Sequence, residues 1–112
     1  MRYLMLVCVD PTVELSPDER ATIGEETDSW VAEMDGRGVR VEGAALRPVA
    51  EAATVRVQDG HLQVSHGPHA EAHEQIGGFD LLECSDLGEA IEVACKHPMA
   101  RFGAVEVRAY WD

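Results

Sequence analysis

Residues 2–9 read RYLMLVCV, an almost unbroken series of apolar residues rich in types that favour strands. A series of this kind is typical of a strand in the middle of a sheet, covered on both faces. Asp10 and Pro11 end it, so the segment is far too short to cross a bilayer. We therefore predict a central strand over residues 2–9.

A helix is predicted after a short loop. Residues 16–19 read SPDE, which supplies a capping serine, a proline at the first helical position and the glutamate of a capping box. Gly36 and Gly38 end this helix. Residues at helical spacing form one face that we expect to pack on a sheet: Ile23, Thr27, Trp30, Val31 and Met34.

Strands and one more helix follow. Alternating apolar residues predict strands over residues 39–46, 53–57, 61–64, 79–84 and 105–110. Asp59-Gly60 is a hairpin turn, and Asp86 begins a second helix with a capping box. The core-facing side of that helix is expected to carry Leu87, Ile91, Ala94 and Cys95.

This order predicts an α+β fold, the ferredoxin-like βαββαβ plan with an inserted β-hairpin, as a single domain over residues 1–112. Two helices cannot cover both faces of such a sheet, so one face stays partly apolar and needs a partner. A homodimer that packs sheet on sheet satisfies this need. We therefore expect a homodimer.

Charge and targeting signals restrict the partners and the compartment. Lys and Arg number 9 against 21 Asp and Glu, a formal net charge of −12, which argues against nucleic acid and against an anionic membrane. The chain shows no signal peptide. Its odd number of cysteines does not form a disulfide framework, so Cys8, Cys84 and Cys95 are expected as buried thiols. The predicted location is cytoplasmic.

Residues 64–79 read VSHGPHAEAHEQIGGF, which resembles the signature of the YCII-related family, DGPF-type branch. That signature reads Asp-Gly-Pro-Phe-Ala-Glu, then Lys-Glu and a Leu-Gly-Gly-Phe-like run. The resemblance extends over essentially the whole chain. It implies a ferredoxin-like fold that dimerises as an α/β barrel. It implies little about function, except that some members are encoded near, or fused to, extracytoplasmic-function sigma factors.

The departures from the signature concern the residues with chemistry. His66 replaces the signature Asp, His69 the Phe and His73 the Lys. In the broader YCII-like group, a His–Asp pair in a cleft has been suggested as catalytic. The first helix here carries no histidine, and His97-Pro98 lies near the position of an Asp-Pro. We interpret His97 as a cation favoured at a helix C-terminus.

The segment 65–76 holds the candidate site residues. His66, His69 and His73 are candidates for acid–base catalysis or for binding zinc or another first-row metal, although no cofactor is predicted. The alternative is a purely structural role, with a turn at Gly67-Pro68, solvated histidines and locally paired glutamates. Arg101 either meets an anionic ligand or pairs with a surface carboxylate. The expected ligand-binding residues are His66, His69, Glu71, Glu74 and Arg101.

Three functions are consistent with these patterns. The first is a homodimer that binds a small polar ligand in a cleft between the sheet and the loop 65–76. The second is an enzyme that uses the loop histidines for acid–base or metal-assisted chemistry. The third is an acidic protein-interaction module linked to sigma-factor regulation. The sequence does not decide whether the protein is an enzyme.

Overall fold

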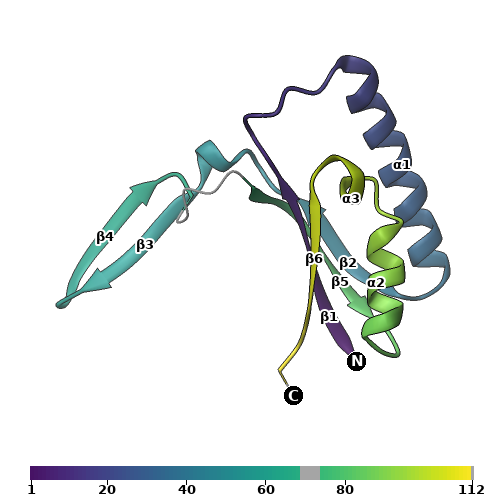
Figure 1. Cartoon of the computed structure of the whole chain (residues 1–112). Coiled ribbons are helices and arrows are strands. Elements are labelled where there is room, and N and C mark those ends of the chain that lie inside the picture. Colours follow the sequence, from purple (N-terminus) through teal and green to yellow (C-terminus); the bar gives the residue numbers. More distant parts are fainter. Residues whose placement is uncertain (69–73, 112) are drawn as a thin grey trace.

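The structure is a computed structural model that describes residues 1–68 and 74–111 (Figure 1). Its elements follow the predicted order, with two short helical turns added. They are β1 (Arg2–Val9), α1 (Pro17–Gly36), β2 (Arg40–Ala45), the 3₁₀ turn η1 (Val49–Glu51), β3 (Ala53–Gln58), β4 (His61–His66), β5 (Gln75–Glu83), α2 (Leu87–Cys95), α3 (Met99–Phe102) and β6 (Ala104–Ala109).

Within the described residues, the main sheet has the strand order β2-β5-β1-β6, and every neighbouring pair is antiparallel. This is the order of a ferredoxin-like sheet, with the β3–β4 hairpin inserted between its second and third strands. β1 lies between β5 and β6, so its predicted central position is confirmed. The chain therefore has the expected α+β fold.

The helices cover one face of this sheet (Figure 1). Tyr3, Met5 and Val7 of β1 point into the core beneath them. The alternate residues Leu4 and Leu6 lie on the other face and are only partly buried. The prediction of a strand covered on both faces is therefore wrong for the single chain, because α1, α2 and α3 lie on one side of the sheet.

Helix α1 forms as its sequence predicts. Ser16 accepts a hydrogen bond from the Glu19 backbone N–H at 3.1 Å, and the Glu19 carboxylate accepts one from the Ser16 N–H at 3.0 Å. Trp30 and Met34 are buried. The predicted apolar face of α1 therefore packs on the sheet.

Helix α2 is turned relative to the predicted face. Ala94 is buried as predicted, together with Ala90 and Val93, whereas Leu87, Ile91 and Cys95 are exposed. The helix is apolar on two sides, and small side chains allow the closer approach to the core. Of the cysteines expected as buried thiols, only Cys84 is fully buried, because Cys8 is half-buried and Cys95 is exposed.

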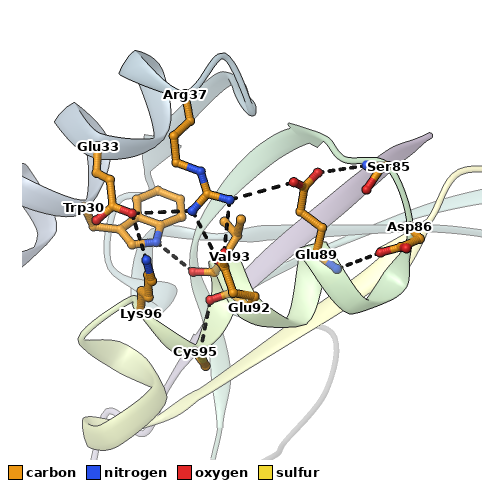
Figure 2. A network of polar contacts seen from close by, with 10 residues as sticks. All are labelled: Trp30, Glu33, Arg37, Ser85, Asp86, Glu89, Glu92, Val93, Cys95 and Lys96. Carbon is orange, nitrogen blue, oxygen red and sulfur yellow. Dashed lines mark hydrogen bonds and ion pairs between the residues drawn. The ribbon is translucent and has the colours of Figure 1, made fainter.

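A polar network joins α1 to α2 (Figure 2). Arg37 contacts both carboxylate oxygens of Glu92 at 3.1 Å, and Lys96 contacts Glu33 at 3.0 Å. Beneath these contacts, the buried Trp30 indole N–H donates to the Val93 carbonyl at 2.9 Å. The network fixes the end of α2, and with it the residues that follow.

Strands β3 and β4 form a separate two-stranded sheet, which we call the arm (Ala53–His66). Asp59 and Gly60 at its tip both have positive φ, as a two-residue hairpin turn requires. Figure 1 shows the arm leaving the sheet on the side opposite to the helices. The predicted hairpin is confirmed, but it does not join the main sheet.

Within the described residues, no helix is both long and apolar enough to span a membrane.

Candidate functional site

A cavity of about 270 Å³ lies between α1, the sheet and the segment after α2. Its walls are mostly apolar, and its polar side chains come from four different elements or loops. This combination of apolar walls with a few polar groups is typical of small-molecule sites. The lining residues are Val7, Val9, Thr27, Trp30, Val31, Arg40, Ala44, Ala45, Gly77, Gly78, Phe79, Asp80, His97 and Met99.

Asp80 places a carboxylate on the helix-covered face of β5, where it is only 7% exposed. The opposing residue on β2 is Gly43. A Cβ at Gly43 would lie 2.7 Å from the Asp80 Cγ and closer still to Oδ1. The missing side chain at position 43 therefore provides the space that the carboxylate occupies.

Arg40 compensates the buried charge of Asp80. Its Nε donates to Asp80 Oδ1 at 2.8 Å, and its Nη1 contacts Asp35 at 3.2 Å. Burial raises the pKa of the Asp80 carboxyl, and the hydrogen bond from Arg40 opposes that rise. The net direction is upward, so Asp80 holds a proton more readily than an exposed aspartate does.

His97 lies in the loop after α2 and is 4% exposed. The Met99 backbone N–H donates to its Nδ1 at 3.1 Å, and its ring contacts the edge of Trp30 with centroids 4.9 Å apart. Burial lowers the pKa of the imidazole. Its interpretation as a cation at a helix end is therefore wrong, because the ring is buried and favours the neutral form.

The hydrogen bond from Met99 determines the tautomer of His97. Because Nδ1 accepts, the proton of the neutral ring lies on Nε2. Within the described residues, every fully buried side-chain nitrogen and oxygen has a hydrogen-bond partner, whereas His97 Nε2 has none. Nε2 is therefore not fully buried. We infer that it reaches the cavity, which His97 lines. His97 thus offers a hydrogen-bond donor, and Asp80 offers a carboxylate of raised pKa.

Of the site residues predicted from the sequence, the described ones (His66, Glu74 and Arg101) do not line this cavity. His69, Glu71 and His73 lie outside the described residues. His66 ends β4 and Glu74 precedes β5, and both are exposed. Gly77 and Gly78, which follow the same segment, line the cavity. The segment 65–76 therefore ends beside the site.

Arg101 on α3 forms an ion pair with Glu26 of α1. Its guanidinium also lies 5.5 Å from the Phe102 ring centroid. Among the described residues, no group of three His, Cys, Asp or Glu side chains is arranged to hold a metal ion. Since two of the three candidate histidines lie outside that part, the metal site stays a prediction.

Sequence reasoning did not select Arg40, Asp80 or His97. One signal was available, because Asp80 is a charged residue inside the apolar run 79–82. A charge at a position that alternation assigns to the core needs a partner. The partner, Arg40, could not be identified without the β2–β5 register, in which a shift between Arg40 and Glu42 turns Arg40 toward the core.

Three comparisons with known proteins place the chain. A solved structure of 5-chloro-2-hydroxyhydroquinone dehydrochlorinase (TftG) from Burkholderia phenoliruptrix AC1100, in complex with 2,5-dihydroxybenzoquinone, is similar in fold, with a TM-score of 0.52. It is 13% identical, and the match covers 99% of this chain and 94% of that one. An uncharacterised protein of Rhizobium meliloti (strain 1021) is 39% identical over 83 residues, and the match is given as covering 61% of this chain and 67% of that protein. The YCII-related domain model matches residues 1–112, so the chain belongs to the YCII-related family.

Proposed function

We propose that the protein binds a small carbonyl compound in the cavity between α1 and the sheet and catalyses a proton transfer on it. Asp80 is the general base, and His97 is the hydrogen-bond donor to the carbonyl oxygen. The observation that carries this proposal is the hydrogen bond from the Met99 N–H to His97 Nδ1, which leaves Nε2–H as the donor.

The size of the cavity indicates the size of the compound. A cavity of about 150 Å³ holds benzene, so 270 Å³ accommodates one substituted six-membered ring. The ligand named for the structurally similar dehydrochlorinase, 2,5-dihydroxybenzoquinone, is a single ring that carries carbonyl groups. This likeness supports a ring-sized carbonyl compound, and the segment 65–76 leads directly into the cavity-lining Gly77 and Gly78.

The proposed step is proton abstraction next to a carbonyl. Asp80 takes the proton, the C–H electron pair moves toward the carbonyl, and negative charge develops on the oxygen that accepts from His97 Nε2–H. The intermediate then regains a proton at another atom or expels a leaving group. A neutral histidine can stabilise the developing oxyanion by donating a hydrogen bond, without itself gaining or losing a proton.

Binding is tested through Trp30, which lines the cavity. In a Trp111→Phe background, single-ring carbonyl compounds, with 2,5-dihydroxybenzoquinone among them, are titrated while the Trp30 fluorescence is followed. We expect saturable quenching that Thr27→Phe abolishes, because the added ring fills the cavity. Ser29→Phe, on the exposed side of the same helix, should leave binding unchanged. Equal binding in both variants would contradict the proposed site.

Catalysis is tested by deuterium exchange. A compound that binds should exchange hydrogen for deuterium next to its carbonyl in D₂O, and Asp80→Asn should abolish this exchange but keep the binding. This result separates an enzyme from a pure binding module. Exchange at the wild-type rate in the variant would exclude Asp80 as the base.

We also propose that the protein is a homodimer in which the open faces of two sheets meet. The face that carries Leu4, Leu6 and Phe79 is only partly buried in one chain, and packing two such faces removes apolar surface from water. Sedimentation equilibrium at micromolar concentration should give twice the chain mass of 12.2 kDa. A 12.2 kDa species alone would contradict it.

A protein partner is a second candidate, and one observation favours it. The exposed side of α2 presents Leu87 and Ile91, and the edge strand β6 lies beside it. An apolar surface of this kind suits another protein, such as a sigma factor. Ile91→Lys should abolish co-elution with that protein and leave the cavity able to bind. Unchanged co-elution would exclude this surface.

A further inference from the structure

The arm exposes four large apolar side chains on one face. Val55 is opposite Val64, and Val57 is opposite Leu62, so all four point the same way. Their exposed fractions run from 53% to 68%. The other face of the arm carries polar pairs such as Arg56 with Gln63. The arm is thus amphipathic, with its apolar side toward solvent.

An isolated hairpin is not stable by itself. Two strands without a covering layer are at best marginally stable in water, and every residue of β4 is exposed. The ladder between its strands continues one step past the arm, where the Gly67 N–H donates to the Ala52 carbonyl at 2.6 Å, and this bond joins the two strands of the hairpin to each other. The apolar face therefore needs an occupant that one chain does not supply.

The exposed surface area and the radius of gyration of one chain are both larger than those of a compact monomer, as expected if a partner is missing. One chain exposes 7569 Å², whereas a compact monomer of 12.2 kDa exposes about 6,100 Å². Its radius of gyration is 15.8 Å, against about 13 Å for a compact domain of this length. The excess surface of roughly 1,500 Å² exceeds the ~800 Å² that each partner buries in a standard interface.

The shape of the chain favours a second copy as the occupant. The arm leaves the sheet on the side of its open face (Figure 1), and a hollow of about 510 Å³ lined by Leu46, Pro68 and Ile76 lies at the arm's root. Each copy therefore offers both an apolar arm face and a partly exposed sheet face. Two copies can cover these surfaces for each other about a two-fold axis.

Charge distribution supports the same occupant. Two copies with a net charge of −12 each repel one another. The arm avoids this repulsion, because its charged side chains are Arg56 and Asp59, which cancel, apart from the histidines. The arm is thus a part of the chain that can approach an acidic copy of itself without a charge penalty.

We infer that the arm clasps the partner in the homodimer, with Val55, Val57, Leu62 and Val64 packed at the edge of the partner's open sheet face. This inference rests on the proposed homodimer and adds to it the segment that holds the two copies together. No residue of the arm belongs to the core of its own chain. Packing on the partner therefore explains why the arm extends away from its own sheet.

The test uses two adjacent positions of β4. Leu62→Asp places a charge on the apolar face of the arm, and Gln63→Asp places the same charge on the polar face. We expect Leu62→Asp to raise the dimer dissociation constant about tenfold or more, and Gln63→Asp to leave it within about twofold. Sedimentation equilibrium measures both. A dimer unaffected by Leu62→Asp would overturn the clasp and leave the sheet-on-sheet dimer intact, whereas a monomeric wild type would overturn both.

A second measurement does not depend on the stability of a charged variant. A photo-crosslinking amino acid at Val57 is placed in a mixed sample of isotope-labelled and unlabelled chains. We expect crosslinks between differently labelled chains, on the edge strand β2 or β6 of the partner's sheet. Crosslinks confined to chains of one label, or no crosslink to the sheet face, would overturn the inference. Ligand binding at Trp30 is read separately and does not depend on either result.

Discussion

At the scale of single residues, the site depends on a glycine and a histidine whose roles come from their neighbours. Gly43 leaves the space that Asp80 occupies, and Met99 sets the tautomer of His97. Positions 43 and 80 meet only through strand pairing, whereas positions 97 and 99 are close in sequence and meet in the loop after α2. Their identities alone therefore gave no sign of the site.

The first prediction concerns Gly43. Gly43→Ala should destabilise the protein by about 1–3 kcal/mol, because the added methyl overlaps the Asp80 carboxylate. Gly24→Ala is the matched control: nothing lies within 4 Å of its Cβ position in α1, so it should stabilise by about 0.5–1 kcal/mol. Urea unfolding measures both. Equal effects would show that the space at position 43 is not required.

The second prediction concerns pH. Burial lowers the pKa of His97 below its ordinary value of 6.5, so the unfolded chain takes up this proton at a higher pH than the folded protein. The stability that depends on the neutral ring is present above pH 6.5 and falls as the pH drops toward the lower folded value. Asp80 has the opposite sign, because burial raises its pKa and its protonation favours the folded state.

His97→Gln removes the first effect and keeps the second. Urea midpoints at about pH 7.5 and pH 5.5 should therefore show a smaller loss of stability on acidification in the variant than in the wild type. An identical loss in both proteins would mean that His97 titrates normally and is not held neutral.

At the scale of elements, local chemistry predicted the starts of helices better than their orientation. The capping box at Ser16 and the turn at Asp59-Gly60 formed as expected, because both depend on residues within four positions of each other. Of the predicted core-facing residues of α2, only Ala94 is buried. Its helix is apolar on two sides, so spacing alone could not tell which side meets the core.

The third prediction tests that orientation on one helix. Val93→Ala should cost about 2 kcal/mol, because Val93 is fully buried and its removal leaves a cavity. Ile91→Ala should change stability by less than about 0.5 kcal/mol, since Ile91 is 53% exposed. Denaturant unfolding compares them, and a larger effect at Ile91 would contradict the described packing.

At the scale of the whole molecule, the order of elements was enough to predict the ferredoxin-like plan but not the site. The strand order β2-β5-β1-β6 follows from that plan. The cavity instead assembles residues from α1, β2, β5 and the loop after α2, which only the folded chain brings together. The histidine-rich segment was predicted to be the site because its histidines are close together in the sequence. Arg40, Asp80 and His97 are far apart in the sequence and meet only in the folded chain.

The fourth prediction concerns assembly. If the homodimer forms, its melting temperature should rise with protein concentration, because association stabilises only the folded state. Leu62→Asp should lower the melting temperature at low concentration more than at high concentration. Scanning calorimetry over a wide range of concentrations measures this. A wild-type melting temperature independent of concentration would contradict the dimer.

The proposed binding site for a carbonyl compound depends on His97 and Asp80. Nitrogen NMR of the His97 imidazole, with a single-ring carbonyl compound added to saturation, tests it. We expect the Nε2 resonance to shift as its N–H donates to the compound, while Nδ1 keeps the signature of an acceptor. A compound that binds with no change at Nε2, or a ring that carries its proton on Nδ1, would contradict it.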